Sequence, residues 1–206
     1  MTNLQGVTIF LATSFPARDP GQRFPSFEVY RILSSINAFT RMILNCNGKL
    51  VFGGHPAITP MILMISRDLG VKNSVTVYKS DWCREELLED VAQIEIKERG
   101  CVTWTPKGRD EEDSLNIMRK EMIRNTPLAG AIFLGDMEGM CDEFRMLKKY
   151  SPTTPCIPVP GPRDAASGIE GDYETLGLVD FCKSRSYTFQ AACFVKALEK
   201  YRTSKN

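Results

Sequence analysis

Six short apolar runs, separated by longer amphipathic segments, constrain the fold of this chain most strongly. The first run, Gly6–Phe15, is rich in β-branched and aromatic residues, which is typical of a buried strand. The other predicted strands are Lys49–Phe52, Ser74–Lys79, Cys101–Thr105, Ala129–Leu134 and Cys156–Val159. Helical spacing predicts helices from Phe27 to about Asn47, and over Pro60–Leu69, Trp82–Arg99, Glu111–Arg124, Asp142–Tyr150 and Tyr187–Tyr201. This alternation predicts an α/β fold, a Rossmann-like parallel sheet with helices on both faces.

Composition narrows the class of protein. With 206 residues, 43% of them hydrophobic, the chain fits a single domain over residues 1–206. Lys and Arg total 26 against 25 Asp and Glu, so charge implies neither a nucleic-acid nor a membrane partner. No apolar run approaches the roughly 18 residues of a membrane span, and no signal-peptide pattern is present. Seven cysteines without a C-x-x-C pair favour a cytoplasmic location, and a single histidine leaves no recognisable metal site.

Unusual residues follow three of the predicted strands. In an open parallel sheet, ligands bind beyond the carboxyl ends of the strands, where helix N-termini offer amides to anions. The candidate ligand-binding residues at these three ends are Thr13 and Ser14, then Gly53, Gly54 and His55, and finally Gly135, Asp136, Met137, Glu138 and Gly139. The glycines let a ligand approach the backbone. The sequence contains neither G-x-G-x-x-G nor a P-loop, so we expect no resident dinucleotide cofactor.

The turn after the second predicted strand is the most distinctive of these ends. Thr59 followed by Pro60 predicts a helix N-cap whose first amides are left free for a phosphate, with Thr59 and His55 lining the site. The alternative interpretation is a tight strand-to-helix turn in which His55 is an ordinary turn residue. Arg18 and Arg23, in the loop after the first strand, are further phosphate ligands or, alternatively, solvated loop arginines. The glycine-containing stretch Gly161–Asp180 predicts a long surface loop on the ligand face.

Three separated motifs carry a family resemblance. FLATSFP, LVFGGHPAITP and AIFLGDMEGMCDEF together resemble the SLOG superfamily, the Rossmannoid group that links DprA-like and LOG-like proteins. The resemblance is greatest to a branch of bacterial conflict and nucleotide-signalling systems, whose members are thought to bind nucleotides or NAD-derived signals such as cyclic ADP-ribose species. It implies a sensor or sequestering module for an ADP-ribose-like ligand in a bacterial or phage conflict (anti-phage) system. It also implies a separately encoded effector as a partner and, as in related proteins, a homodimer.

The last motif departs from the P-G-G-x-G-T-x-x-E pattern of LOG phosphoribohydrolases. Leu134 replaces the proline, Asp136 the second glycine and Met140 the threonine, and one extra residue precedes Gly139. Binding survives such changes better than catalysis does. If the protein is an enzyme, the resemblance implies a LOG-like nucleoside-monophosphate phosphoribohydrolase, an N-glycosidase, with Glu143 stabilising an oxocarbenium-like transition state. The alternative for Glu143 is an exposed carboxylate in the first turn of a helix. A DprA-like DNA-binding function is disfavoured by the near-zero net charge.

Overall fold

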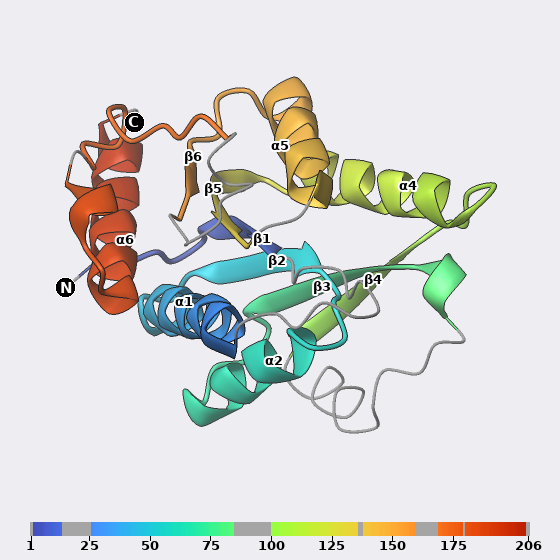
Figure 1. The fold of residues 1–206 in the computed structure, drawn as a ribbon, viewed down its shortest axis with the longest axis horizontal. Helices are drawn as coiled ribbons and strands as arrows, with labels where there is room; N and C mark the ends of the chain where they lie inside the picture. Colours follow the sequence, from blue (N-terminus) through green and yellow to red (C-terminus); the bar gives the residue numbers. More distant parts are fainter. Residues whose placement is uncertain are drawn as a thin grey trace.

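A single parallel sheet organises the molecule. The computed structural model describes residues 2–13, 26–84, 100–135, 138–159, 169–178 and 180–204 (Figure 1). Its strands, in the order β4-β3-β2-β1-β5-β6, are all parallel to their neighbours. The strands are β1 (Thr8–Thr13), β2 (Lys49–Gly53), β3 (Val75–Ser80), β4 (Gly100–Thr105), β5 (Leu128–Leu134) and β6 (Cys156–Pro158). The predicted α/β class with a Rossmann-like parallel sheet is confirmed.

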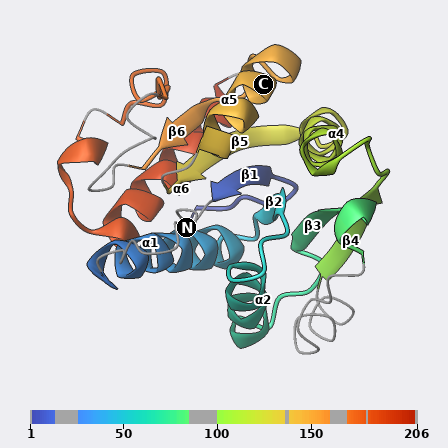
Figure 2. The ribbon, with the colours of Figure 1, turned by 45° about the vertical axis from the view of Figure 1, so that its right-hand side comes forward.

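Helices cover both faces of this sheet. The helices are α1 (Ser26–Asn45), α2 (Thr59–Asp68), α4 (Glu111–Arg124), α5 (Glu138–Tyr150) and α6 (Tyr187–Thr203), with 3-10 turns η1 (Asp81–Cys83) and η3 (Phe181–Lys183). Helices α1, α2 and α6 lie on one face, and α4 and α5 on the other (Figures 1 and 2). Each face of the sheet has its own hydrophobic core. Because side chains alternate along a strand, Ile9 and Leu11 of β1 enter the core under α1, α2 and α6, and Phe10 and Ala12 enter the core under α4 and α5. Within the described residues, no helix is both long and apolar enough to cross a bilayer.

Most predicted elements are confirmed to within two residues, and two boundaries need comment. Helix α5 begins at Glu138, four residues before the predicted start at Asp142, because Gly139 is tolerated in the first helical turn rather than remaining in a loop. Of the helix predicted over Trp82–Arg99, residues 85–99 lie outside the described residues. The described part, Asp81–Cys83, is the 3-10 turn η1. That the whole of residues 1–206 forms one domain stays a prediction.

The segment after β6 is packed against the sheet, in contrast to the surface loop predicted over Gly161–Asp180. Residues 160–168 and 179 lie outside the described part of the chain, but Ile169, Leu176 and Leu178 are buried. Asp172 binds the backbone of β6 twice, because its amide donates to the Cys156 carbonyl at 2.8 Å and its Oδ2 accepts from the Cys156 amide at 2.8 Å. Apolar burial and these backbone contacts fix the described part of the segment along the outer side of β6.

Candidate functional site

The strand order of the sheet reverses direction between β1 and β5. The chain runs outward from β1 through β2 and β3 to β4, then returns to β5 on the other side of β1. In an open α/β sheet, such a reversal of strand order is where ligands bind, outside the carboxyl ends of the strands. Thr13 pairs in register with Leu134, so β1 and β5 end level with each other. This is the topological switch point of the fold.

Three of the predicted strand-end positions belong to neighbouring strands. Thr13 ends β1, Gly53 ends β2 and Gly135 follows β5, and β2, β1 and β5 are consecutive in the sheet. Gly135 has a φ of 123°, a conformation that residues with a side chain rarely adopt. The fold therefore brings these three sequence motifs, far apart in the chain, to the same edge of the sheet.

The turn after β2 differs from the prediction in its hydrogen bonds. The His55 carbonyl accepts from the amides of Ile58 (3.1 Å) and Thr59 (2.9 Å), and the His55 Nδ1 accepts from the Ala57 amide at 3.2 Å. The prediction that the first amides are left free is therefore wrong for these three groups. His55 itself accepts hydrogen bonds from these three amides. The turn formed by Pro56 and Ala57 brings the amides close to the His55 carbonyl and ring.

Thr59 also has a different place in helix α2. The N-cap is Ile58, without a side-chain cap, and Thr59 is the first helical residue, so the N-cap prediction is wrong by one position. The Thr59 side chain is fully buried, and its hydroxyl has no hydrogen-bond partner among the described residues. A contact between Thr59 and a ligand stays a prediction.

Gly54 makes room for a buried lysine. A Cβ on Gly54 would lie 2.7 Å from Lys79 Cε and 2.7 Å from Val77 Cγ1, both side chains of β3. Lys79, near the end of β3, is only 6% exposed. A Cβ on the neighbouring Gly53 would meet only the flexible tip of Met118, at 3.3 Å. A side chain is therefore excluded much more strongly at Gly54 than at Gly53.

His55 is held in its neutral form. Burial lowers the pKa of its imidazole, and the positive charge of Lys79 lowers this pKa further. Because Nδ1 accepts a hydrogen bond from the Ala57 amide, the proton of the neutral ring is on Nε2. At neutral pH the ring is therefore a hydrogen-bond donor through Nε2.

Glu143 forms a largely buried pair with an arginine that sequence reasoning did not single out. Its Oε1 lies 3.8 Å from Arg119 Nε, and the two side chains are 14% and 17% exposed, respectively. Burial raises the pKa of Glu143 to about 7, even though Arg119 lowers it, and Asp142 raises it slightly further. Glu143 is in the second turn of α5, so the interpretation as an exposed first-turn carboxylate is wrong.

A signal for Arg119 was present in the sequence. It follows the buried Met118 and lies four residues before the buried Ile123, at the border of the face that α4 packs against the sheet. At the border of a packed helix face, an arginine side chain can lie against the protein instead of extending into solvent, as Arg119 does. Its partner on α5 is adjacent only in space, and the helical pattern of α4 alone does not identify it.

Five predicted ligand-binding residues lie outside the described part of the chain. They are Ser14, Arg18, Arg23, Asp136 and Met137. Glu138 and Gly139 are the first two residues of α5, and their backbone is helical. The ligand-binding roles of these residues stay predictions.

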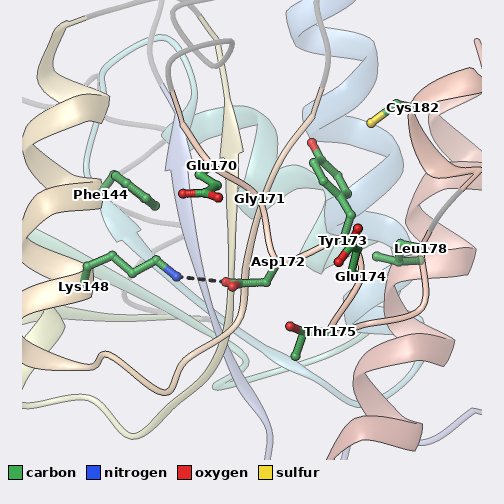
Figure 3. A pocket seen from close by; sticks show the side chains of 10 residues that line it. All are labelled: Phe144, Lys148, Glu170, Gly171, Asp172, Tyr173, Glu174, Thr175, Leu178 and Cys182. Atoms are coloured by element: carbon green, nitrogen blue, oxygen red, sulfur yellow. Dashed lines mark hydrogen bonds and ion pairs between the residues drawn. The ribbon is translucent and has the colours of Figure 1, made fainter.

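A pocket of about 850 Å³ lies between α5 and the segment that follows β6 (Figure 3). Lys148 reaches from α5 toward Asp172, and their charged groups are 3.0 Å apart. The wall also carries the carboxylates of Glu170 and Glu174, so carboxylates outnumber the one lysine. This lining repels a phosphate and does not suit a nucleotide. Within the described ranges, no group of His, Cys, Asp and Glu side chains is arranged to hold a metal ion.

The fold and the strand order define a Rossmann-like α/β domain with a topological switch point between β1 and β5. A model of the SLOG cluster3 family matches residues 24–192, so the chain belongs to this family, and the predicted membership of the SLOG superfamily is confirmed. A comparison with curated proteins gave no match. Membership of the SLOG family indicates a nucleotide-related role.

Proposed function

We propose that this protein binds a nucleotide or NAD-derived, ADP-ribose-like ligand at the carboxyl ends of β1, β2 and β5, as a sensor or sequestering module of a bacterial or phage conflict system. The observation that carries the proposal is that three motifs of a SLOG-family chain meet at the switch point of a parallel sheet. Ligands of open α/β sheets bind at such points.

The chemistry of the described residues at this edge suits a nucleotide. Thr13 offers a hydroxyl at the end of β1 and is partly exposed. Gly53 and Gly135 allow close approach to the backbone, and His55 lies in the turn that follows β2.

A second candidate function, an N-glycosidase, is favoured by one observation. A buried carboxyl group with a pKa of about 7 is protonated in about half the molecules at neutral pH, as a general acid requires. Arg119, at 3.8 Å, stabilises the carboxylate once the proton has left. In this function Glu143 protonates the leaving base or stabilises the ribosyl cation, and Glu143→Gln abolishes turnover while the fold is retained.

The test of binding uses a matched pair of variants on one strand. Thr13 and Thr8 are both partly buried, but they are at opposite ends of β1. The wild type, Thr13→Val and Thr8→Val are incubated with NAD, ADP-ribose, cyclic ADP-ribose isomers, AMP and cyclic dinucleotides. Thermal stability and chromatographic products are read on the same samples. A ligand at a hundred times its dissociation constant adds about 2.7 kcal/mol to the free energy of unfolding.

Each outcome decides between the candidates. We expect at least one ligand to stabilise the wild type and to be recovered unchanged, with weaker binding to Thr13→Val than to Thr8→Val. Release of free base, lost in Glu143→Gln, supports the N-glycosidase instead. Failure of the whole panel to stabilise the wild type refutes nucleotide binding, and equal binding by the two threonine variants refutes its location.

A further inference from the structure

We propose that the outer face of α4 and α5 is the surface through which two copies of this chain associate, with the helices of one copy antiparallel to those of the other. The inference goes beyond the proposed ligand, because it concerns the helical layer on one face of the sheet and not the strand ends (Figures 1 and 2). It rests on the distribution of charge along the two helices and on the groove between them.

Charges of opposite sign are segregated along both helices. Helix α4 begins with three acidic residues, Glu111–Asp113, whereas its second half has three cations and one carboxylate. Helix α5 repeats the pattern, because its three acidic residues lie among its first six and its three cations follow them. Both helices connect parallel strands, so both run from the carboxyl edge of the sheet to its amino edge. Their shared face is therefore acidic toward the carboxyl edge and basic toward the amino edge.

A groove between the two helices makes this face suitable for a partner. The helix macrodipole favours acidic N-termini and basic C-termini, so segregated charge does not by itself require one. The groove has a volume of about 490 Å³, and its wall contains the half-buried apolar side chains of Ile117 and Met146. It extends along α4 from Glu112 to Lys120, eight residues that cover about 12 Å of the helix axis. An apolar floor thus lies between an acidic end and a basic end.

Glu112 and Lys120 are the available charges of this groove. Both are exposed, and within the described part of the chain neither forms an ion pair. Other carboxylates in the wall already have partners in the same copy. Asp113 lies 3.2 Å from an arginine of the preceding turn, and Asp142 lies 2.7 Å from Arg145. A second molecule therefore meets one unpaired anion and one unpaired cation on α4.

Two-fold symmetry pairs these two charges. Asn116 is midway between Glu112 and Lys120 in the sequence, so an axis that passes beside Asn116, perpendicular to α4, places Glu112 of each copy opposite Lys120 of the other. The same axis sets the acidic half of α5 against the basic half of α5 in the other copy. An axis parallel to the helices would set like charges against each other. Charge complementarity therefore selects a second copy in the antiparallel arrangement.

The size of the face predicts weak association. Helix α4 has 14 residues and α5 has 13. With a rise of 1.5 Å per residue and a helix width of about 10 Å, the pair presents roughly 20 Å by 20 Å. This is an area of roughly 400 Å², below the ~800 Å² that each partner contributes to a standard interface. We therefore expect a concentration-dependent dimer that salt weakens, because its specificity comes from exposed charges.

Sedimentation velocity on the full chain measures this association. The wild type is studied from about 1 µM to about 500 µM protein, a range that covers weak dimers. Each series is run in about 50 mM and about 500 mM NaCl, which gives weak and strong screening of charge. The dimer fraction should rise with protein concentration, and the association constant should fall roughly tenfold at the higher salt concentration.

Charge reversal identifies the surface. In Lys120→Glu, and separately in Glu112→Lys, like charges meet twice across the two-fold axis, so each variant should dimerise at least roughly tenfold more weakly than the wild type. An equimolar mixture of the two variants should associate again, because the acidic face of one then meets the basic face of the other. Lys200→Glu is the matched control and should leave association unchanged, since Lys200 is an exposed lysine of α6, on the opposite face of the sheet.

Every outcome decides for or against this surface. A wild type that stays monomeric throughout the low-salt series refutes the dimer and leaves the proposed ligand function standing. A dimer that neither Lys120→Glu nor Glu112→Lys weakens, or that Lys200→Glu weakens equally, refutes the location. Recovery of association in the mixture shows that both variants are folded. Should one of the two fail to fold, the other tests the same contacts, because each reverses one member of the same pair.

Discussion

Replacing Glu143 with glutamine should stabilise this protein at alkaline pH. The pKa of Glu143 rises from its ordinary value of 4.5 to about 7 in the fold. Between these values the folded state holds more protons than the unfolded state, so the free energy of unfolding falls as the pH rises from 4.5 to 7. Glutamine resembles the neutral acid in shape and cannot ionise, so Glu143→Gln lacks this loss of stability.

The magnitude follows from the two pKa values. Their difference of about 2.5, at roughly 1.4 kcal/mol for each tenfold change in proton affinity, gives about 3 kcal/mol. Because the Glu143 side chain is only 14% exposed, solvent screening reduces this figure little. Glu143→Gln should therefore be about 3 kcal/mol more stable than the wild type at pH 8. At pH 5 the difference should shrink to under about 1 kcal/mol.

Urea denaturation of both proteins at pH 5, 6, 7 and 8 measures this difference. Glu174→Gln, at an exposed position on the segment after β6, is the control and should change stability by less than about 0.5 kcal/mol throughout. Two results would refute the argument that burial raises the pKa of Glu143 more than Arg119 lowers it. One is a Glu143→Gln protein that is less stable than the wild type at pH 8, and the other is a stability difference that does not change with pH. A stabilising substitution at this position indicates that the carboxyl group is kept for its chemistry at a cost in stability.

Two further predictions test the packing of the described chain. Gly54→Ala should lower the free energy of unfolding by about 1–3 kcal/mol in urea denaturation, because its Cβ would lie 2.7 Å from Val77 Cγ1 as well as 2.7 Å from Lys79 Cε. Gly53→Ala should cost clearly less, and equal effects would contradict the steric argument. The exposed thiol of Cys182 should react with iodoacetamide in the native protein, as read by mass spectrometry, whereas Cys156 should not, because burial raises its pKa to about 12. Equal labelling of both cysteines without denaturant would contradict the burial of Cys156.

The sheet could be predicted from the sequence because its signal is local. Each strand is a short apolar run flanked by helical periodicity, and a parallel sheet buried on both faces needs such runs. The carboxyl-end positions followed from the same reasoning, since the position of Thr13 and Gly53 in their strands decides the edge on which they lie.

The details of the site depended on interactions that local patterns do not encode. His55 uses its own carbonyl and ring nitrogen to bind the amides that the turn otherwise leaves free. The pairing of Arg119 with Glu143 results from the packing of α4 against α5, two elements separated by a strand. The purpose of Gly54 became clear only with Lys79 of the next strand beside it. The last two are contacts between residues distant in sequence, on which periodicity does not report. The His55 bonds are local, but they depend on the conformation of a turn, which has no periodic pattern.

The segment that covers β6 has a consequence for association between molecules. An edge strand with unpaired backbone groups is a template for a strand of another chain, which leads to aggregation. Here β6 has only three residues, ends in Pro158, and has the amide and carbonyl of Cys156 bonded to Asp172. Tyr173 also donates its hydroxyl hydrogen to the Pro158 carbonyl. The backbone groups that would start an intermolecular sheet on this side are thus already occupied, so removing the Asp172 carboxylate should expose the protein to strand-to-strand aggregation before it unfolds.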